Sequence, residues 1–287
     1  IAFPTAAEAI PENDYTRSPF YRTLNGEWSF LRVDRPGAEP EGFFRSGHDD
    51  SSWGTMPVPG IWELNGCGDP VYTNKPYPWH KFFEVKPPLI PHEQNYTGLY
   101  RRTVTVPADW KGRDIFIHIG SATSNVTLWV NGHEAGYSED SKLEAEFDIT
   151  RYLTPGSDNL IVMRVIRWCD GSFLEDQDFW RLSGIGRDCY LYARDKRQIT
   201  DIQVDAAPSA DYTAGTVAVK AFFPRQARGC SVELALTDAQ GRSVASQQLR
   251  VTKDEERCTL DAGKVALWSA ETPVLYGLTA TLRAPAG

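Results

Sequence analysis

Residues 126–132 read VTLWVNG, and this short stretch indicates how the chain folds. Its first five residues are mostly β-branched or aromatic, which predicts a strand. The Asn131-Gly132 pair that follows is typical of a two-residue type I′ hairpin, because both central positions of that turn need positive φ angles. We therefore expect strands on both sides of the pair and a chain built from β-hairpins.

Similar strand-like runs recur along the whole sequence. Each is short, rich in β-branched or aromatic residues, and bounded by Gly, Pro or Asn. They are residues 99–107 (LYRRTVTVP), 114–119 (DIFIHI), 159–168 (NLIVMRVIRW), 189–192 (CYLY), 216–223 (TVAVKAFF), 231–237 (SVELALT), 244–251 (VASQQLRV) and 276–283 (YGLTATLR). Long amphipathic helices are absent from the pattern. The sequence therefore predicts an all-β fold.

A change in composition divides the chain in two. All tryptophans except Trp268 lie in the first 180 residues, and residues 193–200 (ARDKRQIT) form a polar, charged stretch between two strand-like runs. We place the boundary at about residue 197, which gives domains of residues 1–197 and 198–287. The second is predicted to be a smaller β-sandwich, because its strands recur at the spacing typical of that architecture. This second sandwich is expected to be truncated, because at least one further strand would be needed to complete it.

Composition excludes several classes of protein. The chain of 287 residues has 30 Lys and Arg against 38 Asp and Glu, a net charge of −8, so we expect no nucleic-acid partner. No apolar run approaches the roughly 18 residues of a membrane-spanning helix, so we expect no membrane span. The odd number of dispersed cysteines predicts free thiols rather than a disulfide framework. They are Cys67, Cys169, Cys189, Cys230 and Cys258.

Most catalytic motifs are missing from the sequence. There is no Gly-x-Ser-x-Gly elbow and no Walker loop, and Gly184-Ile185-Gly186 lacks the third glycine of a dinucleotide fingerprint. The five histidines show no metal-binding spacing. These patterns give no support to an esterase, a nucleotide-binding or a zinc-binding interpretation.

Residues 170–181 (DGSFLEDQDFWR) form an acidic and aromatic cluster. Its carboxylates are Asp170, Glu175, Asp176 and Asp178, and ionised groups at this density belong on a loop because burying them is costly. Three interpretations remain open on spacing alone: a solvated acidic loop, a sugar or cation site, and a glycosidase carboxylate pair. A catalytic pair needs defined separations of roughly 5–9 Å, which a sequence does not supply.

The same segment closely resembles a family signature. Residues 170–194, DGSFLEDQDFWRLSGIGRDCYLYAR, resemble the end of the first domain of the large β-galactosidases of glycoside hydrolase family 2. The resemblance is closer to β-galactosidases than to β-glucuronidases, and it continues along essentially the whole chain. The other matching stretches are residues 24–30 (LNGEWSF), 58–63 (VPGIWE), 70–79 (PVYTNKPYPW), 128–153 (LWVNGHEAGYSEDSKLEAEFDITRYL) and 267–276 (LWSAETPVLY).

The resemblance implies a specific layout. Residues 1–197 are expected to form a jelly-roll sugar-binding domain and residues 198–287 an immunoglobulin-like sandwich. The family's catalytic (β/α)₈ barrel and its two catalytic glutamates have no counterpart here. The chain is therefore expected to be a non-catalytic part of a retaining β-galactosidase, with a free-standing carbohydrate-binding module or a structural scaffold as alternatives.

The resemblance also implies site residues. Asp178 matches the carboxylate that ligates sodium and contacts the galactose 6-hydroxyl, and Asn74 matches a loop residue that hydrogen-bonds galactose. Asp170 and Glu139 match two ligands of a structural magnesium ion, although Glu139 replaces the usual Gln and the other ligands lie in a segment that this chain does not contain. Lys75 stands where the family usually has a small apolar residue, so the aglycone side differs.

The expected partners follow from the same resemblance. They are a β-galactoside substrate, the catalytic barrel of the parent chain and further copies of the parent in a homo-oligomer. The sequence does not fix the compartment, and a cytoplasmic or periplasmic bacterial-type enzyme is implied.

Overall fold

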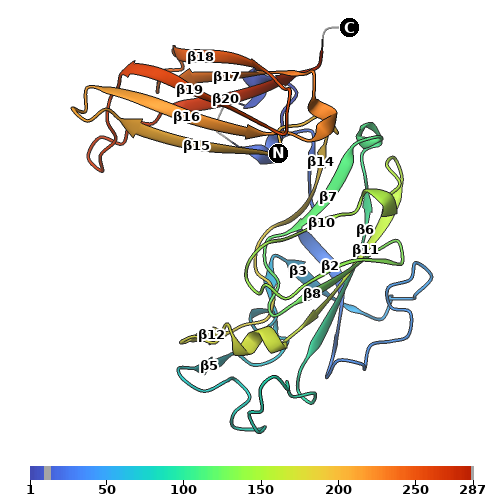
Figure 1. The fold of residues 1–287 in the computed structure, drawn as a ribbon. Helices are drawn as coiled ribbons and strands as arrows, with labels where there is room; N and C mark the ends of the chain where they lie inside the picture. The colour runs from blue at the N-terminus through green and yellow to red at the C-terminus, as the bar shows by residue number, and fades with distance from the viewer. Residues whose placement is uncertain (10–13, 286–287) are drawn as a thin grey trace. The chain divides into compact units, whose positions relative to one another are not determined.

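The computed structural model describes residues 1–9 and 14–285, and these fall into two compact units (Figure 1). The first unit comprises residues 19–193, and the second combines residues 1–18 with residues 194–287. Almost all regular structure is β, so the all-β prediction is confirmed. The short helical turns of the chain are α1 (Ala6–Ala9), η1 (Tyr15–Arg17), η2 (Glu63–Asn65), η3 (Ala108–Trp110), η4 (Thr150–Tyr152), η5 (Asp170–Phe173) and η6 (Arg225–Ala227).

The first unit is a jelly-roll sandwich of two antiparallel sheets (Figure 1). One sheet has the order β1 (Tyr21–Thr23), β14 (Cys189–Arg194), β7 (Asp114–Ile119) and β10 (Ala145–Asp148). The other has the order β3 (Gly54–Val58), β2 (Gly26–Val33), β6 (Thr97–Thr105), β11 (Asp158–Ile166), β8 (Val126–Val130) and β9 (His133–Ser138). Two short ladders lie beside them, β5 (Val71–Thr73) with β12 (Phe179–Arg181) and β4 (Gly60–Ile61) with β13 (Gly184–Ile185).

The hairpin at Asn131-Gly132 confirms the first prediction from the sequence. Asn131 has a φ of 50° and Gly132 a φ of 84°, as a type I′ turn requires. The turn joins β8 to β9, and the strand-like runs predicted elsewhere correspond to strands within a few residues. The sequence pattern missed β2, β15, β19 and several of the shorter strands, among them β5 and β12.

Fully buried aromatic side chains fill the core between the two sheets. Trp28, Trp62 and Trp110 are each at most 1% exposed. Their indole N–H groups still find acceptors: Trp28 donates to the Leu24 carbonyl oxygen at 2.9 Å, and Trp62 donates to the Tyr100 hydroxyl. The large rings therefore pack without leaving these three polar atoms unsatisfied, since Trp110 also donates to a backbone carbonyl.

One glycine makes this packing possible. A Cβ atom placed on Gly98 of β6 would lie 2.8 Å from Cε2 of Phe30 and would overlap the indole of Trp62. The rings of Phe30 and Trp62 fill the space that the missing side chain leaves, and their centroids are 5.9 Å apart. Glycine is needed at this position for space, not for a turn.

The second unit is a smaller sandwich of two three-stranded sheets (Figure 1). One has the order β15 (Asp201–Pro208), β16 (Ala214–Phe222) and β19 (Glu255–Lys264), and the other has the order β18 (Ser243–Arg250), β17 (Ser231–Thr237) and β20 (Gly277–Arg283). The inner residues of β16 and β17 alternate with outer ones, as half-buried strands do. All eight residues of β15 are exposed, including Ile202 and Val204.

The observed division differs from the predicted one in two respects. Residues 1–18 group with the second unit, whereas the predicted division places them in the first domain. The first unit ends at residue 193, four residues before the predicted boundary at 197. None of the helical segments in the described part of the chain has the length and apolarity to cross a membrane.

Candidate functional site

The short ladder of β5 and β12 brings the two predicted sugar-binding residues together. Phe179 pairs with Thr73 in this antiparallel ladder. Asp178 precedes Phe179 and Asn74 follows Thr73, so the two residues occupy facing positions one step beyond the last pair. Both are exposed. Residues more than a hundred positions apart in the chain thus present an amide and a carboxylate at the same end of one ladder.

Tyr72 connects the two strands through its side chain. Its hydroxyl donates to Oδ1 of Asp178 at 2.6 Å, and this hydrogen bond, together with the negative charge of the carboxylate, raises the pKa of Tyr72 above its ordinary value. The rings of Tyr72 and Trp180 lie 5.5 Å apart, and both are more than half exposed, at 53% and 57%. A carboxylate and two accessible aromatic faces therefore stand side by side on the surface.

The other carboxylates of the acidic loop have different surroundings. Asp176 forms an ion pair with Arg181, and both side chains are largely buried. Glu175 accepts a hydrogen bond from the Ser141 backbone N–H at 3.2 Å. Burial raises the pKa of Glu175 and of Asp176, in the second case against the opposing effect of Arg181. Glu175 and Asp176 thus anchor the loop, whereas Asp178, like Asp170, is exposed.

An aromatic cluster joins the loop of Asn74 to the start of the acidic loop. Tyr77 stacks on the fully buried Trp79, and Phe173 of η5 lies edge-on to both rings at 4.8 and 5.3 Å. Trp168, just before η5, contacts Trp79 at 5.3 Å. These contacts hold the two loops against each other, which gives the Asn74 and Asp178 segments a common support.

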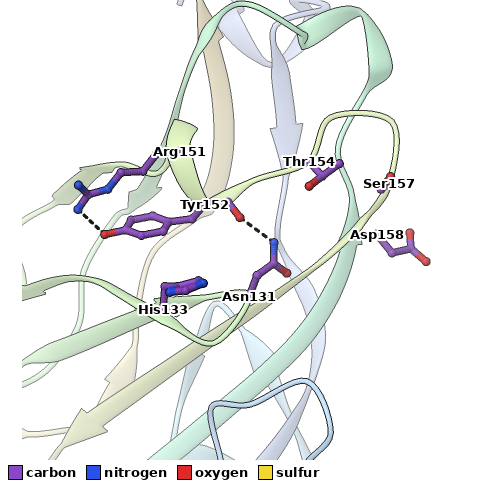
Figure 2. Close-up of a pocket in the computed structure, with 7 residues that line it drawn as sticks. All are labelled: Asn131, His133, Arg151, Tyr152, Thr154, Ser157 and Asp158. Carbon is purple, nitrogen blue, oxygen red and sulfur yellow. Dashed lines mark hydrogen bonds between the residues drawn. The ribbon is translucent and has the colours of Figure 1, made fainter.

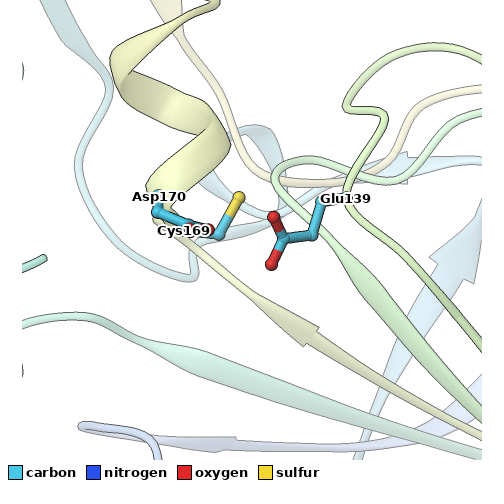
Figure 3. A group of neighbouring side chains, drawn as sticks. All are labelled: Glu139, Cys169 and Asp170. Atoms are coloured by element: carbon cyan, nitrogen blue, oxygen red, sulfur yellow. The ribbon is translucent and has the colours of Figure 1, made fainter. Parts of the chain in front are cut away.

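The predicted magnesium ligands also meet. Glu139 and Asp170 lie together with Cys169, and one potential ligand atom from each falls within 4.8 Å of the others (Figure 3). Two carboxylates suit a hard cation such as magnesium, which prefers oxygen ligands. Cys169 fits it less well, because burial raises the pKa of its thiol and the S–H group points to the Ser124 carbonyl oxygen at 3.7 Å. Glu139 and Asp170 fit the ion as a partial ligand set.

A surface hollow lies at the end of β8 that is remote from the acidic loop (Figure 2). Ser124, before β8, lines the pocket behind the acidic loop, whereas Asn131, after β8, lines this hollow. Its walls include His133, stacked on the ring of Tyr152 at 5.8 Å. The amide of Asn131 has a structural role, because it donates a hydrogen bond to the Tyr152 carbonyl oxygen at 2.8 Å. None of the predicted site residues lines this hollow.

Sequence patterns missed two members of the site. Tyr72 precedes Asn74 by two positions, but its contact with Asp178 depends on a ladder that the pattern did not predict. Lys142 lies in the turn between β9 and β10 and reaches the ring of Phe179 at 3.6 Å. Its one unusual signal is structural, a φ of 69° at a residue other than glycine.

Comparison with known families explains the arrangement. A family model described as the sugar binding domain of glycosyl hydrolases family 2 matches residues 21–195, and a second model of the same family matches residues 198–287. The chain belongs to glycoside hydrolase family 2. Within this family it is 37% identical over 294 residues to a β-galactosidase of Priestia megaterium, and 41% identical over 283 residues to one of Pectobacterium atrosepticum.

This family 2 chain spans about a quarter of those relatives. The alignments cover 99% and 93% of the chain but only 28% and 26% of the two β-galactosidases. The chain corresponds to their N-terminal region, which consists of the sugar-binding domain and the domain that follows it. The predicted resemblance is confirmed.

Solved structures of family 2 proteins share the fold. A family 2 member from Bacteroides cellulosilyticus superposes with a TM-score of 0.67 at 22% identity, covering 92% of this chain and 34% of that one. β-Glucuronidase 2 of Bacteroides uniformis gives a TM-score of 0.69 at 22% identity, covering 92% and 30%. The jelly roll followed by an immunoglobulin-like sandwich, as predicted, is therefore the family 2 arrangement.

Proposed function

We propose that this chain is the non-catalytic N-terminal part of a retaining β-galactosidase and that it contributes Asn74 and Asp178 to the sugar site of the parent enzyme. The observation that carries the proposal is the ladder of β5 and β12, whose last pair, Phe179 with Thr73, directly adjoins both residues. The names of the relatives support the substrate class, a terminal β-D-galactoside. The parent's hydrolysis uses catalytic carboxylates outside this chain, in the barrel.

The chemistry of the two groups suits a pyranose. The Asn74 amide offers both a donor and an acceptor, and the exposed Asp178 carboxylate accepts from hydroxyl groups. The neighbouring rings of Tyr72 and Trp180 present apolar faces of the kind that stack on the CH groups of a sugar. In this proposal Asp178 binds the galactose 6-hydroxyl, and the residues of this chain bind and orient the substrate without moving its protons.

Two cations belong to the proposal. Sodium is assigned to Asp178, whose free carboxylate oxygen supplies a hard ligand and whose remaining partners come from the barrel. Magnesium is assigned to Glu139 and Asp170, where it would neutralise two neighbouring carboxylates and fix the start of η5. The remaining partners proposed are the barrel itself and further copies of the parent in a homo-oligomer.

A free-standing carbohydrate-binding module is the alternative function. Such a module would bind galactose by itself, whereas in our proposal Asn74 and Asp178 form one side of a site that the barrel completes. We expect the isolated chain to bind galactose no more tightly than millimolar, with or without sodium. Calorimetry on the chain separates the two functions, and micromolar binding would favour the module.

The decisive experiment places the chain in a working enzyme. A chimera replaces the matching region of the Priestia megaterium β-galactosidase with this chain, and Asp178→Asn is introduced into it. Loss of a charge-assisted contact of about 1.5–3 kcal/mol should lower kcat/KM on a nitrophenyl β-galactoside roughly 10- to 150-fold. The exposed Asp109→Asn variant is the matched control and should leave kcat/KM unchanged.

A truncated substrate identifies the hydroxyl involved. An α-L-arabinopyranoside keeps the hydroxyl pattern of galactose but lacks the 6-hydroxymethyl group. If Asp178 acts through that group, the variant and the truncated substrate should be strongly non-additive, because they remove two halves of one contact. Additive losses would show that Asp178 merely supports its loop. The chain alone should give no hydrolysis above background, because the catalytic carboxylate pair is supplied by the barrel.

A further inference from the structure

Two cations lie against the ring of Phe179, the residue that follows Asp178. The Lys142 ammonium is 3.6 Å from the ring centroid, and the guanidinium carbon of Arg181 is 4.1 Å from it. Both distances fall within the range of a cation–π interaction, which is stronger where water is partly excluded. We call Lys142, Glu175, Asp176, Phe179 and Arg181 the Phe179 cluster; all five line one small pocket behind the acidic loop.

Arg181 links this cluster to the Asn74 strand. Its side chain is only 9% exposed, and it forms an ion pair with Asp176. Its Nε donates to Oγ1 of Thr73 at 3.2 Å, and Nη2 donates to the Thr73 carbonyl oxygen at 3.5 Å. Thr73 immediately precedes Asn74, so Arg181 ties the ring of Phe179 to the backbone that carries the amide of the sugar site.

Lys142 reaches the cluster from a separate turn. This turn, between β9 and β10, is fastened to the acidic loop where the Ser141 N–H donates to Glu175. Lys142 itself has a φ of 69°, a left-handed conformation that persists in a residue other than glycine only when the surroundings impose it. Partial burial lowers the pKa of its ammonium. The Lys142 residue as a whole is exposed, so its left-handed backbone and the contact of its ammonium with the Phe179 ring are what distinguish it from an ordinary surface lysine.

The charges of the cluster balance. Lys142 and Arg181 supply two positive charges, and Glu175 and Asp176 supply two negative ones. Asp178 is therefore left outside the compensated group, with the Tyr72 hydroxyl as its hydrogen-bond partner. The Phe179 cluster therefore fixes Phe179, the neighbour of Asp178, without neutralising the Asp178 carboxylate.

We propose that Lys142 is a positioning residue, whose ammonium holds the ring of Phe179 and thereby fixes the Asp178 carboxylate opposite Asn74. The part of this inference that concerns sugar rests on the proposed function. The positioning itself concerns only the residues of this chain, so it can be tested without substrate.

The Tyr72 phenol reports where Asp178 lies. Its pKa is raised by the hydrogen bond to Asp178, so a displaced carboxylate should let the pKa fall toward the ordinary value of tyrosine. The whole chain is prepared with ¹³C-labelled tyrosine and titrated by NMR, and Tyr72→Phe assigns the signal. Hydrogen exchange of the backbone amides of residues 178–180 is measured on the same samples.

Lys142→Met keeps the apolar stem and the left-handed backbone but removes the charge. It should lower the Tyr72 pKa and speed exchange of these amides by about 3- to 30-fold, the range expected from a cation–π contact. Lys142→Arg retains a cation for the ring and should restore both values. Lys111→Met, at an exposed lysine, is the matched control and should change neither.

Phe179→Leu provides an independent variant, because it removes the ring and keeps an apolar side chain. It should shift the Tyr72 pKa in the same direction, and adding Lys142→Met to it should produce no further shift. Unchanged pKa and exchange in a folded Lys142→Met chain would overturn the inference, as would additive effects of the two substitutions. If these readouts behave as expected but Asp178→Asn leaves the chimera's kinetics unchanged, the sugar assignment fails and the positioning role stands.

Discussion

The two units of the chain are built from the same kind of strand but bury very different side chains. In the first unit Trp28, Trp62, Trp79 and Trp110 are fully buried. Among the described residues of the second unit, the largest buried side chain is Phe223, and one entire strand, β15, is exposed. Because stabilisation grows with the apolar area removed from water, the jelly roll should be the more stable unit.

Removing a central ring of the jelly roll should give the largest effect. Trp62→Ala deletes an indole that contacts Phe30 and donates to Tyr100, and truncations of this kind cost about 3–5 kcal/mol. For a unit of this size the unfolding temperature should fall by roughly 10 °C. Calorimetry, with near-ultraviolet circular dichroism to follow the tryptophans, measures the change.

Trp268→Ala is the matched control for that experiment. This tryptophan of the second unit is 61% exposed, so its loss should change the free energy of unfolding by no more than about 0.5 kcal/mol. Comparable losses of unfolding free energy in Trp62→Ala and Trp268→Ala would contradict the expected difference between the two units in buried aromatic side chains.

A pair of valines sharpens the comparison within the second unit. Val204 of β15 and Val219 of β16 face each other across the same ladder, yet they are 52% and 1% exposed. Val219→Ala should cost about 2 kcal/mol, whereas Val204→Ala should cost under about 0.5 kcal/mol, because only the first removes buried methyl groups. Urea unfolding of the two variants tests this. A large loss from Val204→Ala would mean that β15 is covered in solution.

Two buried cysteines allow the opening free energies of the two units to be compared without a destabilising substitution. Cys189 of the first unit is 0% exposed and Cys230 of the second is 1% exposed, so each reacts only when its unit opens. Burial raises the pKa of Cys189 to about 12, so its thiol stays protonated while the unit is closed. A pH above the ordinary thiol pKa therefore favours the open state, in which the thiolate forms and reacts. At pH 8 we expect Cys230 to react with iodoacetamide faster, by about tenfold for each 1.4 kcal/mol of difference in opening free energy.

Alkylation rates are also measured in urea, where both thiols are accessible. These rates correct for the difference in intrinsic reactivity between the two cysteines. Mass spectrometry of the labelled peptides follows each cysteine separately, and the half-buried Cys67 and Cys258 should react before the buried ones. Equal corrected rates for the two buried cysteines would show that the units open together.

Much of the fold could be predicted from local patterns. The Asn131-Gly132 turn and most longer strands depend on neighbouring residues, so the sequence shows them directly. β15 was missed because only Ile202 and Val204 of its residues are β-branched, and β12 because three residues carry too little pattern. The placement of residues 1–18 depends on contacts far along the chain, which periodicity does not report.

The candidate site was predictable only in part. Resemblance pointed to Asn74 and Asp178, and to Glu139 and Asp170, while spacing alone left the acidic loop open to three interpretations. Arg181, the partner of Asp176, lies five residues away in the same segment. Two other carboxylates are distinguished by partners far along the chain, Ser141 for Glu175 and Tyr72 for Asp178, and no local pattern encodes these two contacts. The same holds for Cys169, whose sulfur joins the Glu139 and Asp170 carboxylates through the fold.

The space above Gly98 also constrains how this core can change during evolution. Because the missing side chain is filled by the rings of Trp62 and Phe30, a larger residue at position 98 is acceptable only after one of those rings has become smaller. The three positions should therefore vary together among related chains, with the small residue and the large ones exchanging places. A lineage could reach such a rearranged core only through a destabilised intermediate, which makes this glycine a slowly evolving position for reasons of volume alone.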